Sequence, residues 1–104
     1  MVYFNKQSTK DIDDFVVGLL IWKKHDLSVI HVLKYRDDIV SICKMLDPKS
    51  FHFNTQFPIH KRYGEKVHSY RRNKQTYWYI IYNLDPHVNV YIQRILSNHI
   101  NAET

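Results

Sequence analysis

The first half of the chain carries hydrophobic residues at helical spacing. They recur at intervals of three and four residues, which places them on one buried face of a helix. These residues are Ile12, Phe15, Val16, Leu19 and Leu20. Ser8 stands where an N-cap is expected, and the carboxylate of Asp11 follows three residues later, in the helix's first turn. We therefore predict a helix over Ser8–Lys24.

A second stripe with the same period follows after a short connection. Its members are Val32, Tyr35, Ile39, Ile42, Cys43 and Leu46. Asp26 or Ser28 is the expected cap, and the helix should end at Asp47-Pro48, because a residue before proline avoids the helical region. Two helices joined this closely are expected to pack as an antiparallel hairpin. Cys43 lies on the apolar stripe, so we expect a buried small hydrophobe and not a nucleophile.

The second half of the chain changes from helical spacing to alternation. Extended runs rich in aromatic and β-branched residues predict strands near Val67–Arg72, Thr76–Asn83 and Val88–Ile95. Val2–Phe4 is a further short strand, added to the edge of the sheet. The chain is thus expected to be one α+β domain over residues 1–104, with a short N-terminal strand, an antiparallel helix hairpin and a three- to four-stranded antiparallel sheet. The helices should cover one face of that sheet.

Alternation within the strands also predicts which side chains are buried. Trp78 and Tyr82 alternate with Ile80, so these three residues are expected to pack in the core before they serve any other purpose. Arg94 follows the apolar positions of the last strand at the same interval. We expect it to be partly buried and paired with an acid such as Asp85.

The segment between the helices and the sheet, Lys49–Ile59, has a loop-like composition. Phe51, Phe53 and Phe57 are interspersed among polar residues, and we expect them to lie over the core as a lid. An exposed aromatic groove for a partner peptide is the alternative. Lys61–Gly64 is expected to begin a strand.

Composition narrows the class of protein. With 44% hydrophobic and 24% charged residues among 104, the chain should fold as a single domain. Cys43 is the one cysteine, which excludes an intramolecular disulfide and makes a cytoplasmic location the default. The N-terminus lacks the apolar run of a signal peptide, and Phe15–Trp22 is too short to span a bilayer. The seven histidines show no ligand spacing, so we expect no metal and no cofactor.

The positive charge is concentrated in the second half. Residues 1–48 hold seven Lys/Arg and seven Asp/Glu, whereas residues 49–104 hold eight against three. Within Lys61–Lys74 there are six cations and one acid, with aromatic residues nearby. This combination indicates a surface for a phosphate-bearing or acidic partner. The alternative is an edge strand that its cations protect from aggregation.

The stretch from Tyr70 to His99 carries a recognisable series of residues. Tyr70-Arg71-Arg72 leads into the run Tyr77–Asn83, and the strand Val90–Ile95 is followed by Ser97-Asn98-His99. Together with the order strand, helix, helix and antiparallel sheet, this resembles the RelE/ParE superfamily of bacterial type II toxins. Their characteristic strand reads Tyr-Arg, two apolar residues and Tyr. Here Tyr79 stands at the arginine position, and the tail after Ile95 lacks the basic cluster of the family nucleases.

The resemblance implies a growth-inhibiting toxin that a cognate antitoxin protein holds inactive. RelE-like members cleave mRNA on the ribosome and so inhibit translation, which is the function we expect. ParE-like members inhibit DNA gyrase without nuclease activity, and this is the first alternative. A non-toxic small RNA-binding module is the second.

The nuclease hypothesis assigns roles to particular residues. RNA cleavage needs a proton acceptor, cations at the phosphate and a proton donor for the leaving oxygen. The candidate catalytic residues are His99, Arg71, Arg72 and Tyr79. The candidate RNA-binding residues are Lys61, Arg62, Lys66, His68, Lys74 and Tyr77.

Overall fold

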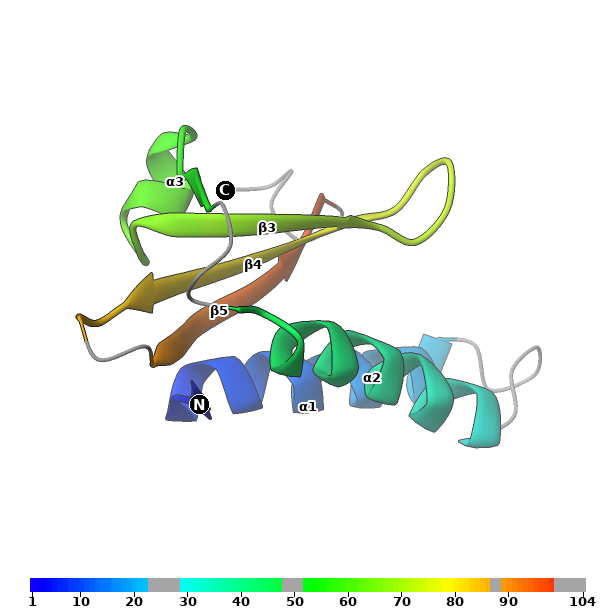
Figure 1. The fold of residues 1–104 in the computed structure, drawn as a ribbon. Helices are drawn as coiled ribbons and strands as arrows, with labels where there is room; N and C mark the ends of the chain where they lie inside the picture. The colour runs from blue at the N-terminus through cyan, green and yellow to red at the C-terminus, as the bar shows by residue number, and fades with distance from the viewer. Residues whose placement is uncertain (23–28, 48–51, 87–88, 99–104) are drawn as a thin grey trace.

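A five-stranded sheet separates two long helices from a short one (Figure 1). The computed structural model describes residues 1–22, 29–47, 52–86 and 89–98. Helices α1 (Lys6–Trp22) and α2 (Val29–Lys44) lie side by side along one face of the sheet, and α3 (Pro58–Lys61) lies on the other side. The predicted α+β class, with an N-terminal strand, a helix pair and a sheet, is confirmed.

The sheet has more strands than expected, and it is mixed. Its spatial order is β1-β5-β4-β3-β2. The strands are β1 (Val2–Phe4), β2 (Phe53–Asn54), β3 (Lys66–Arg71), β4 (Tyr77–Leu84) and β5 (Val90–Ser97). The expected sheet is thus broadly confirmed, with slight differences in the number and direction of its strands. β1 runs parallel to β5, and the two-residue β2 extends the opposite edge beside β3. Both are long-range pairings, which local alternation does not reveal.

Helix α1 begins earlier than predicted and with a different cap. The backbone N–H of Ser8 donates to the side-chain oxygen of Asn5 at 2.7 Å, so Asn5 is the N-cap and Ser8 lies three residues inside it. The Asn5 amide also donates to Gln93 on β5 at 3.1 Å. One side chain thus caps the helix and joins it to the sheet. The proposed caps of the second helix, Asp26 and Ser28, lie outside the described residues.

The core lies between the helix pair and the sheet, as alternation predicted. Trp78, Ile80 and Tyr82 are all at most 2% exposed and pack against Ile39 and Cys43 of α2. The Trp78 indole donates to the Tyr35 hydroxyl at 2.9 Å, so its polar atom is satisfied. Cys43 is fully buried, and burial raises the pKa of its thiol to about 12. Its predicted role as a small hydrophobe is confirmed.

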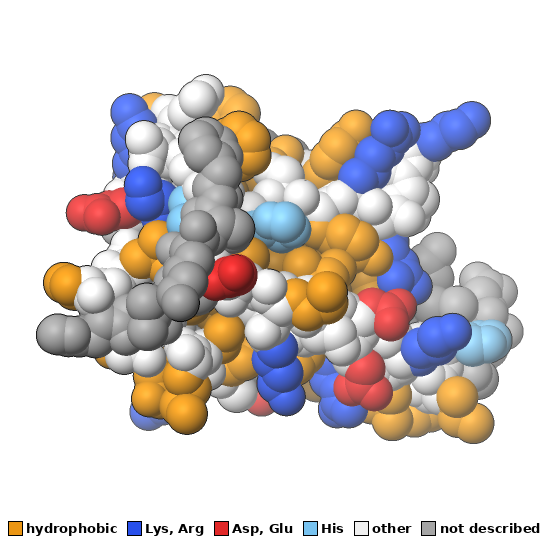
Figure 2. Space-filling model, viewed as in Figure 1, with side chains coloured by type: hydrophobic (Ala, Val, Ile, Leu, Met, Phe, Trp, Pro, Cys, Tyr) orange, Lys and Arg blue, Asp and Glu red, His pale blue; other side chains and the backbone are white. Residues whose placement is uncertain are grey.

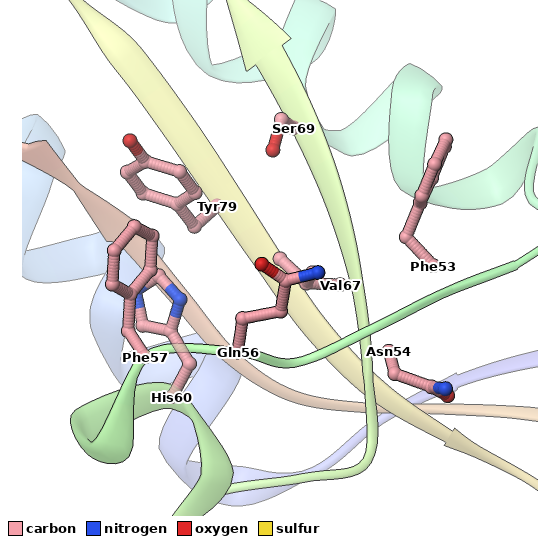
Figure 3. Close-up of a pocket in the computed structure, with 8 residues that line it drawn as sticks. All are labelled: Phe53, Asn54, Gln56, Phe57, His60, Val67, Ser69 and Tyr79. Carbon is pink, nitrogen blue, oxygen red and sulfur yellow. The ribbon is translucent and has the colours of Figure 1, made fainter.

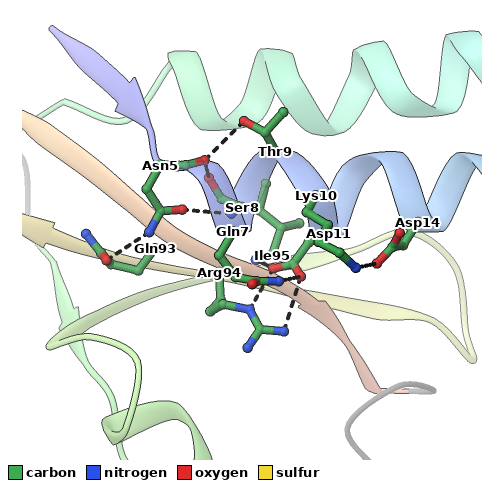
Figure 4. A network of polar contacts seen from close by, with 10 residues as sticks. All are labelled: Asn5, Gln7, Ser8, Thr9, Lys10, Asp11, Asp14, Gln93, Arg94 and Ile95. Atoms are coloured by element: carbon green, nitrogen blue, oxygen red, sulfur yellow. Dashed lines mark hydrogen bonds and ion pairs between the residues drawn. The ribbon is translucent and has the colours of Figure 1, made fainter.

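The pairing of β4 with β5 shifts by one residue between Ile81 and Tyr82. The inward positions of β5 therefore change from the even-numbered Val90 and Ile92 to the odd-numbered Ile95. Near this shift Arg94 is partly buried and paired with an acid, as expected, but the acid is Asp11 and not Asp85. Arg94 donates to Asp11 through Nε at 2.8 Å and Nη2 at 3.1 Å (Figure 4). The Asp85 carboxylate instead accepts from the Tyr91 hydroxyl at 2.9 Å.

The segment before β3 differs from both of its predictions. Lys61 closes α3, and the N–H groups of Tyr63 and Gly64 donate to the His60 carbonyl, so this stretch is a helical turn and not a strand. Phe53 and Phe57 are 65% and 58% exposed, so they do not form a lid over the core. Phe51 lies outside the described residues.

Gly64 is the position at which this turn meets the sheet. A Cβ atom there would lie 2.8 Å from Ile81 Cγ2 and 3.3 Å from the Tyr82 carbonyl oxygen, too close for either to remain in place. We expect Gly64→Ala to destabilise the fold by about 1–3 kcal/mol in urea unfolding. Gly18→Ala is the matched control, because nothing lies within 4 Å of its Cβ position in α1. It should stabilise the helix by about 0.5–1 kcal/mol, and equal midpoints for the two variants would contradict the prediction.

Candidate functional site

The sheet face turned away from the long helices carries a row of functional side chains. Because Trp78 and Ile80 point to the helices, their neighbours Tyr77 and Tyr79 point to the opposite face. Tyr77 pairs across the strands with Arg71, and Tyr79 pairs with Ser69. The Arg71 guanidinium carbon lies 5.5 Å from the centre of the Tyr77 ring. A cation and two half-buried phenols are therefore adjacent on one open surface.

Helix α3 adds a histidine to this row. Pro58 occupies the first turn, where its missing N–H costs nothing, and the helix brings His60 onto the sheet. His60 is 3% exposed, and its ring centre lies 4.8 Å from that of Tyr79 and 5.3 Å from that of Phe57. Burial lowers the pKa of His60 below its usual 6.5, so the imidazole is uncharged at neutral pH and can accept a proton.

A pocket of about 190 Å³ opens beside His60 and Tyr79 (Figure 3). Its walls come from the β2 strand, the loop after it, α3 and the adjoining strands of the sheet. The lining residues are Phe53, Asn54, Gln56, Phe57, His60, Val67, Ser69 and Tyr79. The pocket is thus continuous with the row that leads through Tyr79 and Tyr77 to Arg71.

The predicted cations divide between two places along this surface. Arg71 and Lys74 are exposed at the turn between β3 and β4, and Lys61 and Arg62 are exposed at the end of α3. Figure 2 shows Lys and Arg side chains over both regions, with hydrophobic side chains between them. Lys66 is engaged locally, because its ammonium group donates to Asn54 at 2.6 Å.

Arg71 and Arg72 lie on different sides of the sheet, although they are adjacent in sequence. Arg72 lies on the helix side, where it donates to Asp38 of α2 at 2.7 Å and to the Tyr70 hydroxyl at 3.2 Å. Its guanidinium carbon is 4.1 Å from the centre of the Tyr35 ring. These contacts tie the β3–β4 turn to α2, so Arg72 has a structural role, and Arg71 remains at the open face.

Of the two predicted histidines, only His68 is described, and it is not part of the row. His68 pairs with Ile80 and therefore points to the helix side, where burial lowers its pKa. His99 lies outside the described residues, and its role stays a prediction. The residue before it, Asn98, accepts from the Tyr77 N–H at 3.0 Å and donates to the Gln75 carbonyl at 3.0 Å. The end of β5 is thereby bound to the start of β4.

Sequence reasoning did not identify His60 or Gln56 as site residues, and it named the phenylalanines only in the alternative of an aromatic groove for a partner peptide. The sequence signal that could have placed His60 was the pair Phe57-Pro58. Proline favours the first turn of a helix, so this pair indicates a short helix that begins after Phe57 and carries His60. That such a helix packs on Tyr79, almost twenty positions later in the chain, is a tertiary contact.

Comparisons with protein-family models, with curated proteins and with solved structures found no match to this chain. None of the helices in the described part is long and apolar enough to cross a membrane. Within residues 1–22, 29–47, 52–86 and 89–98, no three His, Cys, Asp or Glu side chains gather in a way that would hold a metal ion.

Proposed function

We propose that this protein is the toxin of a type II toxin–antitoxin pair and that it inhibits translation by cleaving mRNA on the ribosome. The observation that carries the proposal is the row Arg71, Tyr77 and Tyr79 on the open face of the sheet, with the buried His60 packed on Tyr79 in the wall of the pocket. It combines a phosphate-binding cation, two aromatic rings and an uncharged imidazole. The series of residues from Tyr70 to His99, whose pattern resembles the characteristic strands of RelE/ParE toxins, suggests the same function.

The row contains groups suited to each step of RNA cleavage. His60 takes the proton of a ribose 2′-hydroxyl, and the 2′-oxygen then attacks the adjacent phosphorus. Arg71 stabilises the negative charge that builds up on the phosphate oxygens. The bond from phosphorus to the 5′-oxygen breaks, and that oxygen takes up the proton of the Tyr79 hydroxyl. Proton transfer from His60 back to Tyr79 through solvent restores both groups.

The same surface suits an antitoxin. Arg71, Lys74, Lys61 and Arg62 are exposed cations on a domain whose first half is electrically balanced. An antitoxin segment rich in Asp and Glu, laid across this face, would neutralise them and cover the reactive row. We place both proteins in the bacterial cytoplasm, where ribosomes and mRNA are accessible.

The test is pulse labelling after controlled expression in bacteria, with methionine and thymidine incorporation followed separately. We expect protein synthesis to collapse first while DNA synthesis persists. An early loss of thymidine incorporation would instead indicate gyrase as the target and would contradict the nuclease mechanism. Unchanged growth at verified expression would contradict toxicity and favour a non-toxic RNA-binding module.

A further inference from the structure

We propose that the pocket beside Tyr79 binds one unpaired nucleobase, with a preference for adenine, and so selects where the RNA is cut. This inference rests on the proposed function and names the group that the site recognises. It draws on four properties of the pocket: its size, its aromatic walls, its amide and its position next to Arg71.

The size of the pocket suits one planar ring system. Its volume of about 190 Å³ is below the roughly 300–1,000 Å³ typical of sites for drug-sized ligands. It is also open on one side, which allows a base to enter while the backbone that carries it stays at the surface. A single base of an extended strand satisfies both conditions.

The walls of the pocket present solvent-exposed aromatic rings. Phe53 and Phe57 are 65% and 58% exposed and stand on opposite sides of the opening, with Tyr79 beside Phe57 (Figure 3). The His60 ring packs perpendicular to the Phe57 ring and supports it. Exposed rings at fixed positions are the usual platform on which unpaired bases stack. A bound base would remove this apolar surface from water.

Gln56 supplies the group that distinguishes bases. Its side-chain amide lies over Val67 between the two phenylalanines (Figure 3), and it makes no hydrogen bond within the described part of the chain. An amide offers a donor and an acceptor side by side, which matches the N7 and N6 atoms of adenine. Asn54 is not equivalent, because its oxygen already accepts from Lys66 at 2.6 Å.

The pocket is placed so that the phosphate of its base would meet Arg71. Ser69 lines the pocket and precedes Arg71 by two residues on the same face of β3. This separation is roughly 7 Å along a strand. A base held between the phenylalanines therefore positions its own phosphodiester linkage at the cation, which couples recognition to cleavage.

The test is fluorescence anisotropy with labelled 2′-O-methyl RNA decamers, which cannot be cleaved by 2′-hydroxyl attack. One probe is all uridine, and the other carries a single central adenosine. We expect the full-length protein to bind the adenosine probe about tenfold more tightly. Gln56→Leu should bring the two affinities together without weakening binding of the uridine probe. Phe57→Ala should weaken both about tenfold with an unchanged salt dependence.

The control is Tyr3→Ala, which removes a ring that is 44% exposed from the far edge of the sheet and should change neither affinity. Circular dichroism checks that each variant is folded, which is expected because Gln56 and Phe57 are exposed. Wild-type affinity in both pocket variants would contradict the proposal that the pocket binds a base. If Arg71→Ala nevertheless weakened RNA binding, the proposed function would stand. Unchanged binding in Arg71→Ala as well would contradict both proposals.

Discussion

Replacing Asp11 by alanine is expected to destabilise the protein by about 3–5 kcal/mol, because it leaves a half-buried guanidinium without its partner. The Asp11 side chain is 8% exposed and that of Arg94 is 21% exposed. Asp11 accepts both hydrogen bonds from Arg94 and a third from the Ile95 backbone N–H at 2.9 Å (Figure 4). It thus joins α1 to the edge of β5. A loss of this size is a large share of the roughly 5–15 kcal/mol that stabilises a domain.

The measurement is urea unfolding followed by circular dichroism, with two comparison variants. Asp14→Ala removes a carboxylate from the same helix, but its ion pair with Lys10 is exposed, so the midpoint should not change. Asp11→Asn keeps an acceptor for Ile95 and should lose less than Asp11→Ala. If Asp11→Ala unfolded at the same urea concentration as Asp14→Ala, the pair would have no stabilising role.

If the proposed function holds, replacing Arg71 by alanine is expected to abolish growth inhibition and to slow mRNA cleavage by about 10²- to 10³-fold, the usual cost of removing one group that stabilises developing charge. Arg71 is exposed, and within the described residues it contacts the Tyr77 ring and the Asn73 carbonyl. Neither contact neutralises its charge, which leaves it available to a phosphate. The protein should therefore lose activity and keep its stability. The assay is cleavage of a defined mRNA in a bacterial translation extract, with thermal unfolding measured in parallel.

Two other arginines make this prediction specific. Arg36→Ala removes an exposed cation that is paired with Asp37 on α2, away from the open face, and should leave cleavage unchanged. Arg72→Ala breaks the contact with Asp38 and should lower the melting temperature, while the folded fraction still cleaves. Cleavage at the wild-type rate by Arg71→Ala would exclude this arginine from the mechanism.

Local periodicity was sufficient to predict much of the fold. Alternation along Thr76–Asn83 identified Trp78, Ile80 and Tyr82 as core residues, and the helical spacing of apolar residues correctly predicted that Cys43 is buried. These features depend on residues two to four positions apart, so a short stretch of sequence contains the whole signal. The cap of α1 was misassigned for a related reason: Ser8 and Asn5 are both good N-caps, and the choice of Asn5 is favoured by its bond to Gln93 on β5.

The candidate site was only partly predictable, because its members come from distant parts of the chain. The sequence by itself determined the strands that carry Arg71, Tyr77 and Tyr79. Only the tertiary structure decided that α3 brings His60 and Phe57 onto Tyr79, that β1 runs parallel to β5, and that Asp11 is the partner of Arg94. Each of these contacts joins residues that are far apart in the sequence and meet only when the chain folds. Local spacing in the sequence does not predict such a contact, because the free energy that stabilises it comes from burial and from charges that meet only in the folded chain.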